Sequence, residues 1–257
     1  MSVTRLPVAA SNRDQVALRE LKVQLAAAMR MAVLHELDEG IDNHFTARVP
    51  GQPGRYFILP FGYHWSEARA DDLVMFDESG QTLEGEGTVE LSAWCIHAPF
   101  HRLTGAEVVL HTHQPWTVAL NMLKDNRLLN ATQTAVFMAR DIAYDDHYDG
   151  TADLPSEGER LARIAGDKPI VFMKNHGVIT TGKTVAQAYR RLYKLERACR
   201  TQMLAMATGR ELQEIDPATV AKVLAPAELE THSGADRDRL FFEAMMRVVD
   251  RELPGYR

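Results

Sequence analysis

The chain has 257 residues, of which 46% are hydrophobic and 25% charged, and its formal net charge is -6. This composition is typical of a globular protein with a sizeable core, and the negative charge argues against a nucleic-acid partner. No local cluster of Lys and Arg stands out, and no apolar run approaches the roughly 18 residues of a membrane span. With only Cys95 and Cys199, no disulfide framework is expected, so we expect a cytoplasmic protein.

The first half of the chain predicts a long helix followed by short strands. Apolar residues recur at three- and four-residue steps over 14–39, which is typical of an amphipathic helix. The β-rich runs at 45–51, 55–60 and 72–76 predict strands, and 80–88 is predicted to be a loop. A helix is expected after Thr88, with Pro99 either kinking it or marking its first turn.

The second half adds a strand at 106–113, a helix from Pro115, and further strands at 140–146 and 169–182. The last of these is predicted to bend at 175–177, where a tight turn is expected. A long helix is predicted over 184–209, and two more between 217 and 253. We therefore expect one α/β domain over 1–257, with a core at about 18–208 and a helical tail at 209–257.

Two histidines lie one residue apart at the end of the strand "VVLHTH". In a strand, residues i and i+2 point to the same side, so His111 and His113 would present two imidazoles to one metal ion. A catalytic zinc site usually has three protein ligands, and the best third candidate is His176 in "KNHGVIT", because the following glycine can adopt a positive φ. The alternative is that these are polar residues at strand ends, hydrogen-bonded to loops.

The stretches "NHFTARVPG", "FILPFGYHWSEARADDLVMFDESG", "VVLHTH" and "FMKNHGVITTG" occur in this order between Leu18 and Thr208. Together they resemble the class II aldolase/adducin family, in particular its adducin-head-like bacterial members. The resemblance implies a three-layer α/β/α fold around a largely antiparallel sheet, and homotetramers with active sites at subunit interfaces. It also implies that His111, His113 and His176 hold a divalent metal, most often zinc, with Mn, Co or Fe as alternatives.

The chain departs from the family's sugar-phosphate aldolases at several positions. Their Ser-Ser-Glu-Trp-x-x-His segment reads "LSAWCIH" here, so Ser92 and His97 match as substrate-binding candidates while Ala93 replaces the glutamate base. The nearest carboxylate is Glu90, about one helical turn away, which is either a substitute catalytic residue or a residue that complements the helix dipole.

Other aligned positions supply further candidates. His44 stands where those aldolases carry a substrate-contacting Asn, so it is a candidate for substrate binding or acid–base catalysis. Gly62 persists from their phosphate loop, but Phe61 and Tyr63 replace its polar donors, which disfavours a phosphorylated substrate. Tyr144, in "AYDDHYDG", is a further catalytic candidate. Trp94, His97 and His101 share a helical face that packs in the core or contributes to catalysis.

The resemblance implies a metal-dependent carbon–carbon lyase acting on a small, unphosphorylated hydroxy- or oxo-carbonyl or carboxylate substrate through a metal-stabilised enediolate. Because decarboxylation needs no base to start bond cleavage, a decarboxylase of a hydroxy-aromatic or β-keto acid is the alternative enzyme. A non-catalytic, adducin-like oligomeric binding module is the alternative of another class.

Overall fold

The computed structural model describes residues 12–225 and 236–257. Within them, one eight-stranded sheet has the order β4-β3-β2-β1-β5-β8-β7-β6. Every neighbouring pair is antiparallel except β6 and β7, which run parallel. The expected largely antiparallel central sheet is therefore confirmed.

The strands are β1 (His44–Arg48), β2 (Arg55–Ile58), β3 (Val74–Asp77), β4 (Thr82–Glu84), β5 (Val108–Thr112), β6 (Ile142–Asp145), β7 (Ile170–Met173) and β8 (Gly177–Gly182). All residues of β5, β7 and β8 are buried, as expected for strands covered on both faces. The predicted loop at 80–88 was wrong in part, because it contains β4. This strand is three residues long and mostly exposed, so it carries no apolar alternation.

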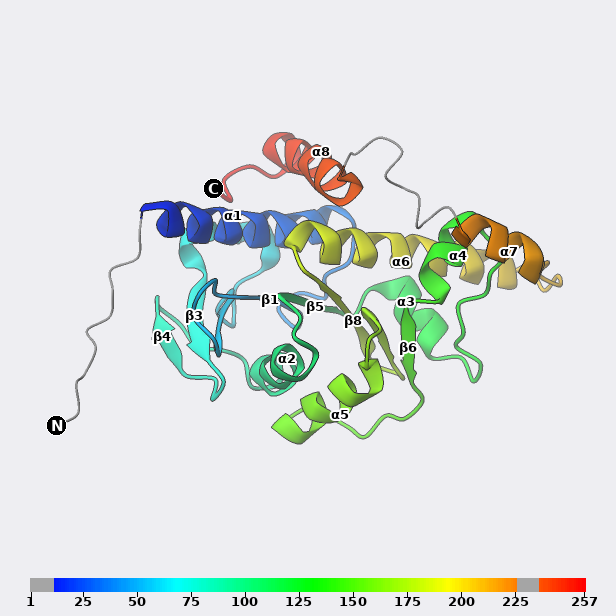
Figure 1. Cartoon of the computed structure of the whole chain (residues 1–257), viewed down its shortest axis with the longest axis horizontal. Helices are drawn as coiled ribbons and strands as arrows, with labels where there is room; N and C mark the ends of the chain where they lie inside the picture. The colour runs from blue at the N-terminus through cyan, green and yellow to red at the C-terminus, as the bar shows by residue number, and fades with distance from the viewer. Residues whose placement is uncertain (1–11, 226–235) are drawn as a thin grey trace.

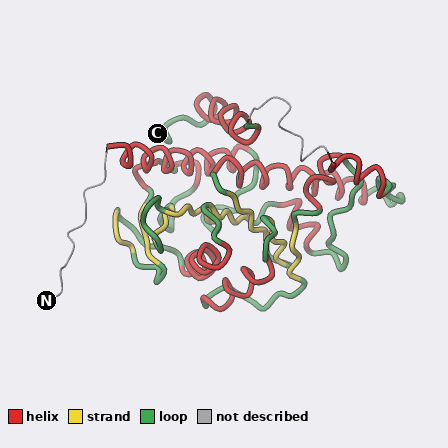
Figure 2. Tube along the Cα trace, in the orientation of Figure 1, coloured by secondary structure: helices red, strands yellow, loops and turns green. Residues whose placement is uncertain are grey.

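The helices are α1 (Asn12–Leu34), α2 (Leu91–Thr104), α3 (Pro115–Asn121), α4 (Gln133–Ala139), α5 (Pro155–Ala165), α6 (Val185–Met206), α7 (Pro217–Leu224) and α8 (Arg237–Glu252), with short 3-10 turns at Trp65–Glu67 and Ala70–Asp72. Helices α1 and α6 cover one face of the sheet and α2 and α5 the other, while α8 lies outside α1 and α6 (Figure 1). Figure 2 shows the strands between these two helical layers. The three-layer α/β/α expectation is confirmed.

Helix α1 ends at Leu34, five residues before the predicted end at 39. His35 turns its Nδ1 toward the Tyr189 hydroxyl, 2.7 Å away, and Glu36 adopts a left-handed conformation with φ 57°. The chain leaves the helix there, so the following residues approach the end of β5. Pro99 lies in the interior of α2 rather than in its first turn, and α4 and α5 had not been predicted.

Apolar side chains fill the space on both sides of the sheet, the larger cluster lying beneath α1 and α6 and a second one beneath α2 and α5. The C-terminal segment is tied to the body of the protein. Tyr256 is fully buried and donates its hydroxyl to Asp250 at 2.8 Å, and Arg30 donates to the carbonyls of Leu253 and Pro254. None of the helices within the described ranges is long and apolar enough to cross a lipid bilayer.

Candidate metal centre

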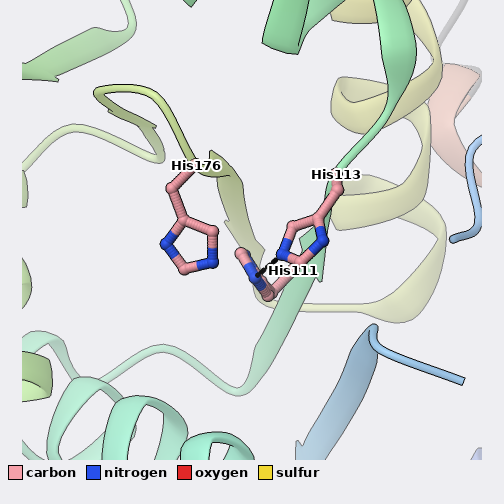
Figure 3. Close-up of side chains that lie close together, drawn as sticks. All are labelled: His111, His113 and His176. Carbon is pink, nitrogen blue, oxygen red and sulfur yellow. Dashed lines mark hydrogen bonds between the residues drawn. The ribbon is translucent and has the colours of Figure 1, made fainter. Parts of the chain in front are cut away.

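Three imidazole rings meet where β5 ends beside the turn that joins β7 to β8. One ligand atom from each of His111, His113 and His176 can be chosen so that all three lie within 4.8 Å of one another. Figure 3 shows the rings facing a common space, with His111 and His113 presented by consecutive parts of one strand end and His176 by the neighbouring turn. The sequence-predicted triad is thus brought together.

The outer hydrogen bonds of these rings indicate which nitrogens are free to bind a cation. Nδ1 of His111 lies 3.0 Å from the Val178 carbonyl, and Nδ1 of His113 lies 2.5 Å from the Glu39 carboxylate. Both partners accept hydrogen bonds, so each Nδ1 carries the proton and each Nε2 presents a lone pair. The two Nε2 atoms are 3.0 Å apart. At this distance the two lone pairs repel each other unless a cation lies beside them. The donor set therefore fits a divalent metal ion.

Burial keeps two of the rings neutral, which is the form that ligates a metal. Burial, with the nearby imidazoles of His113 and His176, holds the pKa of His111 well below its usual range. Burial, with His113 and His44, lowers the pKa of His176 to about 4. Protons therefore do not compete strongly for these nitrogens near neutral pH.

Backbone constraints hold the turn that carries His176. The left-handed residue in this turn is Asn175, with φ 54°, and not Gly177 as the sequence suggested. A glycine is needed at position 177 because neighbouring atoms lie too close for a side chain. A Cβ there would lie 2.5 Å from the Thr112 carbonyl oxygen and 2.9 Å from His113 Cδ2. The buried amide of Asn121 donates to the carbonyls of Met173 and Gly177, at 2.7 and 3.1 Å, and so clamps both ends of the turn.

A cavity of about 350 Å³ opens over the triad. Its lining combines the three imidazoles with carboxylates, hydroxyls and a few apolar groups: Asp42, His44, Glu90, Leu91, Ser92, His111, His113, Tyr148, Gly150, Thr151, Ala152, Asp153 and His176. No Lys or Arg occurs among these described lining residues. The site is therefore negatively charged apart from any bound cation.

Glu90, Ser92 and His44 form a hydrogen-bonded group on one wall of this cavity. Glu90 is the N-cap of α2, and its carboxylate accepts from Ala93 N at 2.9 Å and from Ser92 Oγ at 2.5 Å. His44 Nε2 lies 3.3 Å from the same carboxylate oxygen. Burial alone would raise the pKa of Glu90, but the hydrogen bonds from His44 and Ser92 lower it to about 2. Glu90 therefore both caps α2 and lines the cavity.

His97 lies behind His44 instead of on the cavity wall. Its ring is fully buried and meets the His44 ring edge-on, with centroids 5.4 Å apart. Thr46 Oγ1 lies 2.6 Å from His97 Nδ1 and 2.8 Å from His101 Nε2, so β1 joins the two α2 histidines. The face that carries His97 and His101 packs in the core, and His97 has no direct access to a ligand in the cavity.

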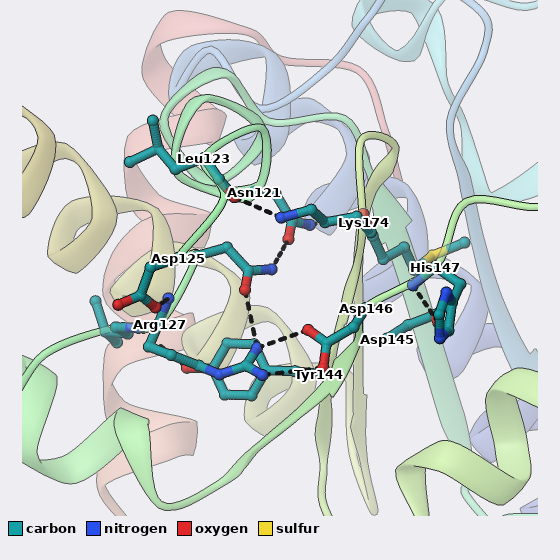
Figure 4. Close-up of polar contacts among 12 residues, drawn as sticks. Asn121, Leu123, Asp125, Arg127, Tyr144, Asp145, Asp146, His147 and Lys174 are labelled. Carbon is teal, nitrogen blue, oxygen red and sulfur yellow. Dashed lines mark hydrogen bonds and ion pairs between the residues drawn. The ribbon is translucent and has the colours of Figure 1, made fainter.

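Two other candidates lie away from the cavity wall. Gly62, with φ 97°, sits in the turn after β2, and a Cβ there would meet open space. The hydroxyl of Tyr144 accepts from Leu128 N at 3.0 Å, and the guanidinium of Arg127 stacks on its ring (Figure 4). These contacts tie Tyr144 to the loop after α3, and Tyr144 is not among the described residues that line the cavity over the triad.

The sequence did not point to Glu39, Asp42, Tyr148 or Asp153 as site residues. Tyr148 is close to the triad, its ring centroid 6.5 Å from that of His176. All four lie in loops, where the sequence has no hydrophobic periodicity that would predict their position. Only their charge or aromatic character could have indicated a role in the site. Tyr148 belongs to the same "AYDDHYDG" segment as Tyr144.

Known proteins are similar to this chain in sequence and in fold. The sequence model of the Class II Aldolase and Adducin N-terminal domain matches residues 23–203. A Caulobacter vibrioides protein named for aldolase class 2 is 31% identical over 92% of this chain and 91% of its own. "Decarboxylase NovR" of Streptomyces niveus is 30% identical over 82% of this chain and 78% of its own.

A solved structure of an aldolase II superfamily protein from Pseudomonas syringae is similar to almost the whole chain. It has a TM-score of 0.86 and 31% identity, and the similarity covers 96% of this chain and 97% of that one. The family match spans well over half of the sequence. The chain therefore belongs to the class II aldolase and adducin family.

Proposed function

We propose that this protein is a metal-dependent carbon–carbon lyase acting on a small, unphosphorylated hydroxy- or oxo-carbonyl or carboxylate substrate. The observation that carries the proposal is the convergence of three imidazoles and the Glu90 carboxylate on one cavity of about 350 Å³. His111, His113 and His176 would hold the ion, with zinc as the first choice and Mn, Co or Fe as alternatives. A divalent ion bound there would act as a Lewis acid toward substrate oxygens.

The chain's own residues then supply binding and proton transfer. Cleavage of a carbon–carbon bond leaves an electron pair on carbon that must receive a proton. Glu90 and His44 share a hydrogen-bonded wall of the cavity, so we assign proton transfer to this pair and orientation of the carboxylate to Ser92. His97 supports His44 from behind, and Gly62 and Tyr144 receive no role in the chemistry.

The charges that line the cavity support an unphosphorylated substrate. Asp42, Glu90 and Asp153 line it, and the described lining includes no Lys or Arg. A phosphate dianion would meet carboxylates with no cationic side chain to offset them. A neutral carbonyl, or a single carboxylate held by the ion, has no such cost.

A decarboxylase is the second candidate, favoured by position 93. Ala93 is fully buried and carries no carboxylate, and departure of CO₂ needs no base. The 30% identity to a protein named as a decarboxylase also supports this candidate. A non-catalytic, adducin-like binding module is less consistent with a complete triad beside an open cavity.

The test loads the purified chain with Zn, Mn, Co or Fe and measures bound metal, then offers hydroxy-aromatic carboxylates and aldol substrates. Release of CO₂ identifies a decarboxylase, and release of an aldehyde identifies an aldolase. The His113→Ala variant is the control for both signals. Less than about a tenth of an equivalent of metal per chain, with no turnover, would favour the binding module.

We also propose a homotetramer in which subunits meet near the cavity. Leu91, Tyr148 and Leu154 are 50%, 52% and 61% exposed, and two of them line the cavity itself. Apolar groups so exposed around one opening fit a subunit contact. Light scattering on the purified chain should give about four times the mass of 28.8 kDa, and a monomer would contradict this.

A further inference from the structure

A second cavity, of about 450 Å³, lies between α4, α6 and α8. Figure 1 shows α4 beside α6 and α8 outside it, on the side of the sheet opposite α2 and α5. The cavity shares no residue with the cavity over the triad. It is therefore a separate feature of the fold.

Cationic side chains dominate its lining. Arg190, Arg191 and Lys194 come from α6 and Arg237 from α8, and the described lining contains no carboxylate. Arg190, Arg191 and Lys194 lie within five residues of the sequence, and Arg237 joins them because α8 packs beside α6. A concentration of positive charge in a chain of net charge -6 calls for a physical reason.

The charges of this wall are only partly compensated. Arg190 pairs with Asp238 at 2.9 Å, whereas among the residues that the structure describes the half-buried Arg191 donates only to the Thr181 carbonyl. Lys194 is half-buried and has no hydrogen bond or ion pair to any described residue. Burial, together with Arg190 and Arg197, lowers the pKa of Lys194, as expected for a crowded cation. Donors on Arg191 and Lys194 remain available to a ligand.

We infer that this cavity binds a small molecule bearing a phosphate group. A phosphate dianion accepts several hydrogen bonds at once and pairs well with the planar fork of arginine. Gln133 and Thr134 of α4 add uncharged polar groups, and Phe137 and Met138 supply an apolar wall for an organic substituent. The volume falls within the range of about 300–1,000 Å³ typical of small-molecule sites. This site differs in charge from the cavity over the triad, which is lined by carboxylates.

Titration calorimetry with phenyl phosphate on the full, metal-loaded chain at constant ionic strength tests the inference. The expected result is saturable binding of one molecule per chain, with no binding of phenol. The Arg191→Met/Lys194→Met variant should bind at least tenfold more weakly. Lys194→Met alone removes a side chain that has no polar partner among the described residues, so it should keep the fold and bind at least threefold more weakly.

Two controls distinguish binding in this cavity from a general effect of charge and from binding at the metal centre. Arg55→Met/Arg163→Met removes the same net charge from β2 and α5 and should leave the affinity unchanged. His113→Ala should also bind phenyl phosphate normally. No saturable heat, equal weakening in the two double variants, or loss of binding in His113→Ala would each overturn the inference, the last by placing the ligand on the metal centre.

Discussion

The carboxylate of Glu39 lies 2.5 Å from Nδ1 of His113, across a separation of 74 residues in the chain. The contact exists because α1 ends at Leu34 and the following loop turns toward the end of β5. A carboxylate in this position fixes the tautomer and the orientation of an imidazole that faces a metal.

Glu39→Gln should therefore weaken metal binding. Removing the charge reduces the basicity of the imidazole, and loss of such a partner typically costs about 10- to 100-fold in metal affinity. Because the Glu39 side chain is 63% exposed, we expect the lower end of that range. Competition with a chromophoric chelator measures the affinity. Glu36→Gln, on the same loop, is the matched control, and an equal effect in both variants would contradict a specific role for Glu39.

Asn121→Ala should loosen the turn that carries His176. The substitution removes the hydrogen bonds from Asn121 to the carbonyls of Met173 and Gly177, each worth about 0.5–1.5 kcal/mol, while the Met173 carbonyl keeps its bond from His176 N. We expect both a lower free energy of unfolding and weaker metal binding. Denaturant titration and chelator competition measure the two effects.

A variant with a similar loss of stability elsewhere provides the comparison for Asn121→Ala. Leu161→Ala opens a cavity beneath α5 and should cost about 2–5 kcal/mol, with metal affinity unchanged. If both variants lose metal affinity in proportion to their stability, Asn121 has no special part in positioning His176.

Glu90→Gln should lower kcat by about 10²- to 10⁴-fold once the substrate is known, because general acid–base catalysis typically contributes this much. Metal content should stay at the wild-type value, since Glu90 lies in the cavity but outside the triad. Glu86→Gln, in the exposed loop before α2, controls for the change of charge. Full activity in Glu90→Gln would remove this residue from the mechanism.

The buried histidines should make the metal-free protein sensitive to acid. Burial lowers the pKa of His101 from 6.5 to about 3, so the unfolded chain binds a proton between these values that the folded protein does not. Stability should therefore fall as pH falls from about 6.5, by up to about 1.4 kcal/mol per pH unit for this one group.

The His101→Gln variant tests that account. Its amide oxygen can still accept from Thr46, and it cannot titrate. Denaturant unfolding of chelator-treated protein between pH 7 and pH 5 should show a shallower slope than wild type. An unchanged slope would mean that His101 is not the group that takes up the proton.

Helices and strands with a strong hydrophobic period could be predicted from the sequence alone, and so could the pairing of His111 with His113. The apolar run before "HTH" predicted a buried strand, and the two-residue repeat of a strand put both imidazoles on one side. The long helix α6 followed in the same way from its three- and four-residue spacing. These features depend on residues close together in the sequence, so they can be predicted without knowledge of the rest of the chain.

The tertiary structure decided which residues from distant parts of the chain complete the two sites. The antiparallel pairing of β5 with β8 brought His176 to His111, and the early end of α1 brought Glu39 to His113. The capping position of Glu90 turned its carboxylate toward His44, while packing placed Tyr144 elsewhere and gathered the cations of α6 and α8. Such contacts join segments far apart in the chain, and no local period encodes them.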